Sequence, residues 1–245
     1  MRSTVLSQAV VLFRKQKPTE LIPPELGGLR VKPSARARRM GLRVEAKTGD
    51  VVFTWPLRAR LSAEKALRFI EENRGWIERQ KKQAVAPQLF APGTVLSIAG
   101  ESIVIEQGQG RGLTRLEDGR LIAHGKPEHL SRRIRDFLRA HAAEVLTALA
   151  DAKAQHIGLA PSAVRILDPK SRWGSCAPDG KIMFSWRLLL APYEVMDYVV
   201  AHEVAHRVHL NHSRRFWKLC AELTTDAGTS RRWLRQNGRQ LMAYR

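Results

Sequence analysis

Cysteine is scarce in this chain: Cys176 and Cys220 are the two cysteines among 245 residues. Two cysteines do not provide the disulfide framework that holds small secreted domains together. No apolar run approaches the roughly 18 residues that a membrane-spanning helix needs. The short apolar stretch from Val5 to Phe13 lacks a convincing cleavage site for a signal peptide. The sequence also has no internal repeat. These absences favour a protein without a membrane span, in the reducing environment of the cytoplasm.

Acidic residues are few relative to basic ones. The chain has 42 Lys and Arg against 23 Asp and Glu, for a formal net charge of +19. Basic and acidic residues number 19 and 8 over 1–85, 8 and 7 over 86–150, and 15 and 8 over 151–245. The excess therefore lies towards both ends, where the densest positions are Arg36, Arg38, Arg39 and Arg43, and then Arg231, Arg232, Arg235 and Arg239. Such charge favours nucleic acid, bound without sequence preference, as a possible partner, although no nucleic-acid motif accompanies it.

Hydrophobic periodicity predicts an α+β protein that begins with a small β-rich part. Alternating residues on both sides of Thr48-Gly49-Asp50 predict a hairpin, and Ser62 is placed to cap the helix that follows, up to about Gln83. Further hairpins are expected around Gly100 and Asp118-Gly119. A long amphipathic helix is expected over residues 128–155.

The rest of the chain alternates less regularly. Short strands are expected at 164–167 and 182–186, and helices at 192–211, 213–226 and 229–241. We therefore expect three segments: a basic N-terminal region of hairpin and helix (1–90), hairpins with a long helix (91–155), and a compact C-terminal core (156–245).

The most informative segment is His202-Glu203-Val204-Ala205-His206, an H-E-x-x-H pattern. Residues four apart lie one turn apart on one helix face, so His202 and His206 direct two imidazoles at one point. A zinc ion needs this of its first two ligands, at roughly 2.0–2.1 Å each. Glu203 is rotated by roughly 100° and is better placed to reach a water on the ion than the ion itself. The pattern predicts a zinc-dependent hydrolase, most typically a peptidase.

Spacing alone leaves more than one residue open as the third ligand. His212 lies six residues after His206, the interval found in H-E-x-x-H-x-x-G-x-x-H peptidases, and we favour it. His209 occupies the position of the glycine that lets the chain turn sharply in that pattern, so another residue must allow the turn here. Asn211 is a candidate, because asparagine tolerates the left-handed conformation that ends helices. His209 itself and Glu222 remain alternative ligands.

Residues around this pattern resemble a known family. The segment Asn211-His212-Ser213-Arg214-Arg215-Phe216-Trp217 is similar to the signature of the YgjP-like metallopeptidases, and Arg172-Trp173-Gly174-Ser175-Cys176 is similar to their W-G-S-C motif. The run Asp197-Tyr198-Val199-Val200 also fits. Weaker likenesses are found at Ser34–Met40 and at Trp76-Ile77. The resemblance is strong over 170–217 and covers most of 30–235.

The resemblance implies more than the spacing does. The family's catalytic part resembles the SprT and Spartan-type zinc proteases, which implies a compact zincin-like domain with a short sheet and an active-site helix. His202, His206 and His212 would then bind one Zn²⁺ per chain, and Glu203 would be the general base. The expected activity is hydrolysis of peptide bonds in a protein or peptide substrate by a zinc-bound water that Glu203 activates.

Other residues and other functions are considered beside this one. Arg172, Ser175 and Tyr198 are candidates for binding substrate or the oxyanion, and the strand at 182–186 is expected to offer its edge to the peptide. One alternative function is a metal-dependent hydrolase of phosphoanhydrides such as nucleoside triphosphates, although no G-x-x-x-x-G-K loop is present. Another is a basic nucleic-acid-associated protein with a structural zinc, but a structural site has no use for a base such as Glu203.

Overall fold

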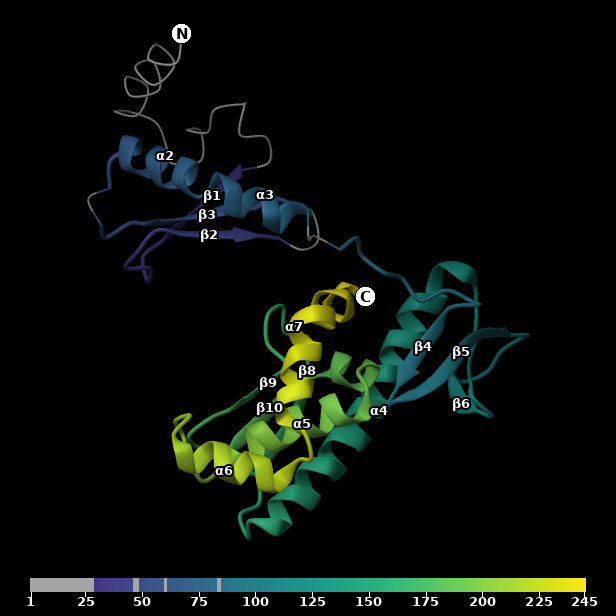
Figure 1. Cartoon of the computed structure of the whole chain (residues 1–245). Coiled ribbons are helices and arrows are strands. Elements are labelled where there is room, and N and C mark those ends of the chain that lie inside the picture. Colours follow the sequence, from purple (N-terminus) through teal and green to yellow (C-terminus); the bar gives the residue numbers. More distant parts are fainter. Residues whose placement is uncertain (1–28, 46–48, 60, 83–84) are drawn as a thin grey trace. The chain divides into compact units, whose positions relative to one another are not determined.

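The computed structural model describes residues 29–245 except 46–48, 60 and 83–84 (Figure 1). The stretch from Val5 to Phe13 therefore lies outside the described residues. The chain divides into two compact units, Met1–Ala86 and Pro87–Arg245. The second unit spans both of the expected segments 91–155 and 156–245, because the long helix of the former packs against the helices of the latter in one core.

The first unit contains a sheet of three strands in the order β1-β3-β2. Strands β1 (Leu29–Ser34) and β3 (Val51–Pro56) are parallel, whereas β2 (Gly41–Val44) forms the expected antiparallel hairpin with β3. Apolar residues of this sheet share a small core with helices α2 (Ala63–Glu72) and α3 (Arg74–Lys82). Phe53 and Ile70 lie at its centre.

The helix expected from Ser62 to about Gln83 is interrupted at Asn73. Ser62 caps α2 as predicted, since its hydroxyl accepts a hydrogen bond from the Lys65 amide at 3.3 Å. At Asn73 the side-chain amide donates to the Phe69 carbonyl at 2.8 Å. This bond competes with the backbone hydrogen bonds that would continue the helix, so a second helix begins at Arg74.

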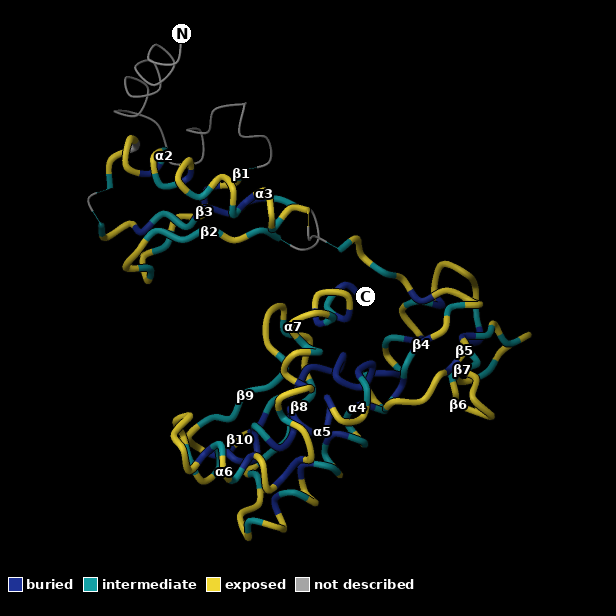
Figure 2. Tube along the Cα trace, viewed as in Figure 1, coloured by how far each residue is buried: buried dark blue, intermediate teal, exposed yellow. Residues whose placement is uncertain are grey.

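The second unit opens with a sheet of four strands in the order β4-β5-β7-β6. Its two hairpins, β4 (Val95–Ile98) with β5 (Glu101–Gly108) and β6 (Arg115–Glu117) with β7 (Arg120–His124), are those expected from the sequence. Helix α4 (Pro127–His156) follows. It buries one residue per turn, from Leu130 to Ala154, in the main core, which explains its amphipathic pattern (Figure 2).

A sheet of three strands in the order β8-β10-β9 lies next to the helix that carries the H-E-x-x-H segment. Strands β8 (Ala163–Leu167) and β10 (Lys181–Ser185) were expected, but β9 (Gly174–Cys176) was not. Strand β9 pairs antiparallel with β10, and β8 pairs with its other side. The expectation that 182–186 offers an edge to a peptide is therefore wrong, because both sides of β10 are hydrogen-bonded. Among the described strands of this sheet, β9 is the edge close to that helix.

The C-terminal part consists of a 3₁₀ turn, η2 (Trp186–Leu190), and helices α5 (Tyr193–Ala205), α6 (Arg214–Leu223) and α7 (Ala227–Ala243). The predicted α+β class is confirmed by these six helices and three small sheets of the described residues. No described helix is long and apolar enough to cross a membrane.

Helix α5 ends earlier than expected. The sequence placed its end at Asn211, with a left-handed residue there, but α5 stops at Ala205, and Asn211 does not have a positive φ. The Arg207 and Val208 amides donate to carbonyls three residues back, at 2.9 and 3.1 Å, which tightens the last turn and ends the helix. The chain then returns along residues 206–213 without a left-handed residue.

Candidate metal centre

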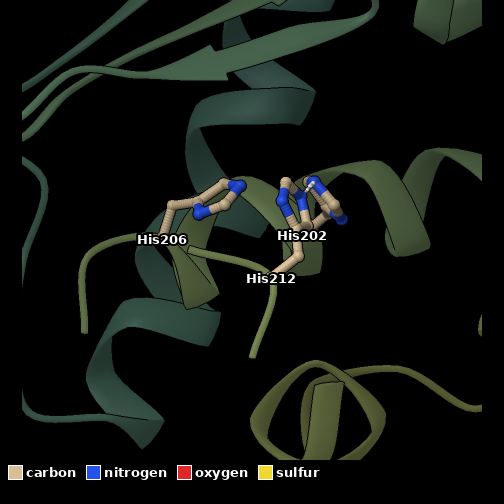
Figure 3. Close-up of side chains that lie close together, drawn as sticks. All are labelled: His202, His206 and His212. Carbon is tan, nitrogen blue, oxygen red and sulfur yellow. Dashed lines mark hydrogen bonds between the residues drawn. The ribbon is translucent and has the colours of Figure 1, made fainter. Parts of the chain in front are cut away.

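Three imidazoles converge where α5 ends and α6 begins. His202 lies in the last turn of α5 and His206 caps the end of that helix, with ring centroids 4.9 Å apart, and His212 comes from the segment that returns before α6 (Figure 3). One nitrogen of each ring lies within 4.8 Å of one nitrogen of the other two. The Nε2 atoms of His202 and His212 face each other at 3.1 Å. Two ligands at the tetrahedral angle on one zinc ion would be about 3.4 Å apart, so this spacing fits a shared metal.

Aromatic residues of α6 support the three rings. The Phe216 ring is fully buried, and its centroid lies 4.5 Å from that of His206, 4.7 Å from His212 and 4.9 Å from His202. Trp217 packs against His212 at 5.6 Å. Ser213 caps the helix by accepting a hydrogen bond from the Phe216 amide at 3.4 Å. The start of α6 is thereby fixed directly behind the cluster, and its aromatic rings orient the imidazoles.

His202 and His206 have the protonation state that metal ligands need. Burial lowers the pKa of His202 to about 4, and the neighbouring His206 and His212 add to the effect. Burial also lowers the pKa of His206, against the opposing effect of its hydrogen bond to the backbone of His209. That bond joins Nδ1 of His206 to the His209 carbonyl at 2.9 Å, so Nδ1 carries the proton and Nε2 is left free for a metal. His202 lacks such support, because its buried Nδ1 has no hydrogen-bond partner among the described residues.

Glu203 lies against β9. Its side chain is buried, and burial raises the pKa of its carboxyl to about 7, although the charge of Arg172 and a hydrogen bond from the backbone of Cys176 act in the opposite direction. A Cβ atom at Gly174 would lie 2.6 Å from Cγ and Oε1 of Glu203, closer than atoms can approach. The missing side chain at Gly174 therefore makes room for this carboxylate.

The two alternative ligands lie elsewhere. His209 and Glu222 both line a hollow of 430 Å³ between the end of α4, the turn after α5 and the outer face of α6, with His156 and Lys218 also in its wall. None of the three converging histidines lines it. Among the described residues, the cluster with metal-binding geometry consists of His202, His206 and His212 alone.

The three candidates for substrate contact come from different elements. Arg172 is exposed and close enough to Glu203 to influence its pKa. Ser175 is the middle residue of β9, opposite Met183. Tyr198 lies one turn before His202, with ring centroids 5.9 Å apart, and it is only 6% exposed. Burial is the main cause that raises the pKa of its hydroxyl to about 12, so Tyr198 stays protonated.

The sequence did not predict that two arginines lie near the cluster. Arg207 directly follows the second histidine, and its side chain donates to the Ala160 carbonyl at 3.1 Å and lies over Gly180. The guanidinium of Arg231, on α7, lies 4.8 Å above the Trp217 ring, and its charge contributes to lowering the pKa of His202. Arg207 contacts Gly180 and Arg231 contacts Trp217, but no sequence pattern predicts either contact.

Comparison with known proteins gives two matches. The family model described as YgjP-like, metallopeptidase domain matches residues 38–237. Among solved structures, the chain is similar to the metallopeptidase zymogen of Pyrococcus abyssi abylysin at 22% identity and a TM-score of 0.34, over 37% of this chain and 93% of that chain. No curated protein sequence matches.

Proposed function

Since the chain belongs to the YgjP-like metallopeptidase family, we propose that it hydrolyses peptide bonds with one zinc ion held by His202, His206 and His212 and with Glu203 as general base. The observation that carries the proposal is the convergence of three imidazole nitrogens within 4.8 Å of one another beside a buried carboxyl that forms no described ion pair.

The donor set favours zinc. Three neutral imidazoles leave one position of a tetrahedral ion open, which is the arrangement of catalytic rather than structural zinc sites. Zinc bound there would supply a water of lowered pKa and polarise the carbonyl of the scissile bond. Phe216 holds the three rings in place, and the hydrogen bond between His206 Nδ1 and the His209 carbonyl directs Nε2 of that ring at the ion.

Glu203 is suited to move the proton. A carboxyl whose pKa is raised to about 7 can accept a proton from the attacking water and then donate it to the leaving amine near neutral pH. Its carboxylate lies against the backbone of Gly174, where any larger residue would displace it.

We assign the binding of substrate to the free edge of β9 and to Arg172. An extended peptide that pairs with Gly174–Cys176 would pass alongside Glu203, which accepts a hydrogen bond from the backbone of Cys176 in the same strand. Arg172 precedes this strand and offers a positive charge to the oxygen that becomes negative in the transition state. Ser175 and Tyr198 then contribute through the backbone of β9 and the packing of His202, respectively.

The decisive test replaces Glu203 by Gln and measures zinc content together with hydrolysis of an unbiased peptide library. We expect Glu203→Gln to retain zinc and to lose hydrolysis by about 10²–10⁴-fold, the range for removal of a general base. Glu222→Gln is the matched control, because Glu222 lies in the separate hollow and should leave both quantities unchanged. Turnover of Glu203→Gln within a few-fold of wild type would exclude the mechanism. Turnover of nucleoside triphosphates but not of peptides by the wild type would replace the substrate class.

A further inference from the structure

A second charged site lies in the first unit, at one end of its parallel strands. Strands β1 and β3 are paired in register up to Ser34 and Pro56, so the loops that follow them leave the same edge of the sheet side by side. Together these loops line a hollow of 440 Å³, whose wall consists of Ala35, Arg36, Ala37, Arg38, Arg58 and Ala59. Three guanidinium groups thus alternate with three small residues that leave the space open.

Ser34 ties the two loops together. Its carbonyl accepts a hydrogen bond from the Leu57 amide at 3.0 Å, and its hydroxyl accepts one from the Ala37 amide at 3.1 Å. The second loop is closed by a bond from the Ala59 amide to the Pro56 carbonyl at 3.2 Å. The backbone that carries the hollow is therefore fixed by hydrogen bonds that involve no arginine side chain.

The positive charge in the hollow is not neutralised by the described residues. Arg36, Arg38 and Arg58 are exposed, and none of them forms an ion pair with a described carboxylate. Other arginines of the same unit do: Arg68 pairs with Glu64 at 3.6 Å, and Arg74 pairs with Glu71 at 2.8 Å. Three like charges around one space without a counter-charge favour an anion that carries several negative groups.

We propose that this hollow binds the phosphate groups of a nucleic acid backbone without preference for base sequence. The planar guanidinium groups suit bidentate contact with phosphate oxygens. The sequence from 29 to 86 holds 15 Lys and Arg against 6 Asp and Glu, so a strand leaving the hollow continues over a positively charged unit. This role is independent of the peptidase activity proposed above, since no residue of the hollow belongs to the histidine cluster.

The test measures binding of a fluorescein-labelled DNA duplex to the full chain by anisotropy at several salt concentrations. The variant Arg36→Gln, Arg38→Gln, Arg58→Gln removes three charges. We expect its affinity at low salt to fall on the order of tenfold or more, and the slope of log K against log salt to become shallower by about 2–3, because each lost phosphate contact contributes roughly 0.9.

A charge-matched control separates the hollow from the general charge. The variant Arg68→Gln, Arg74→Gln, Arg79→Gln removes the same charge from the exposed faces of α2 and α3 and should change affinity by no more than about threefold. The site is refuted if both variants lose affinity equally, if the first binds like wild type, or if wild type shows no binding at micromolar concentration in low salt. Competition by polyglutamate as strong as by DNA at equal charge would overturn the assignment to phosphate. Far-ultraviolet circular dichroism of both variants should match wild type, since the replaced side chains are exposed.

Discussion

The two halves of α5 carry buried carboxylates in opposite circumstances. Asp197 and Glu203 are exposed by only 9% and 7%. Asp197 pairs with Lys153 of α4 at 2.5 Å, and the Lys153 ammonium also donates to the Leu223 carbonyl. Glu203 forms no ion pair with any described residue and lies instead against the bare backbone of Gly174. Burial alone therefore does not distinguish a structural acid from a candidate catalytic one; the presence or absence of a compensating charge does.

The comparison predicts its largest effect on stability at Asp197. Asp197→Ala leaves Lys153 buried without its partner and should lower the free energy of unfolding by about 3–5 kcal/mol. Glu203→Gln should change it by less than about 1 kcal/mol or raise it, because that substitution removes a buried carboxyl that forms no ion pair with a described residue. Urea unfolding of both metal-free variants measures the difference. Similar decreases in the free energy of unfolding for both variants would contradict the proposed difference between Asp197 and Glu203.

A second prediction sharpens the comparison at the histidines. His212→Ala should weaken zinc binding by more than about 100-fold, equivalent to about 2.8 kcal/mol, because one of three ligands is lost. His209→Ala should bind zinc within a few-fold of wild type, since the carbonyl that supports His206 belongs to the backbone and is retained. Competition with a chromogenic chelator reports both affinities. The reverse order of effects would move the third ligand to His209.

The smallest effect is expected at Gly174. A methyl group at this position meets the Glu203 side chain at 2.6 Å, so Gly174→Ala should cost about 1–3 kcal/mol through displacement of the carboxylate or of β9. Peptide hydrolysis should fall as well, because the base moves. Gly75→Ala is the control, since a Cβ there meets only the end of Arg79 at 3.5 Å. Melting temperatures and rates of peptide hydrolysis of the two variants test this prediction. Equal values for both variants would show that the Glu203 side chain can accommodate a methyl group at Gly174.

The periodicity of apolar residues in the sequence predicts some of these structural features but not others. The spacing of His202 and His206 predicts a shared helix face, and the regular apolar residues of α4 predict its burial. The hairpins of β4–β5 and β6–β7 follow from turn residues between alternating strands. In each case the determining interactions lie within a few residues of one another, which is the range over which sequence patterns carry information.

The features that were missed depend on contacts between distant segments. Gly174–Cys176 has three residues and little intrinsic preference for a strand, and it becomes one because β10 offers it hydrogen bonds. The end of α5 at Ala205 depends on bonds within the turn that brings His212 back, which spacing does not specify. The pairing of Lys153 with Asp197 joins residues on two helices far apart in the chain. The prediction of His212 as a ligand rested on an interval and a resemblance, and the structure brings it to the other two histidines.

The short return from α5 to α6 also has a consequence for folding. All three imidazoles come from the 11 residues between His202 and His212, so closing this loop costs little chain entropy even before the core exists. A metal ion would therefore have appreciable affinity for the unfolded chain, and binding to that state subtracts from the stabilisation that the ion gives to the native one. If the proposed site binds zinc, the rise in melting temperature on adding the ion would therefore understate the affinity of the folded site.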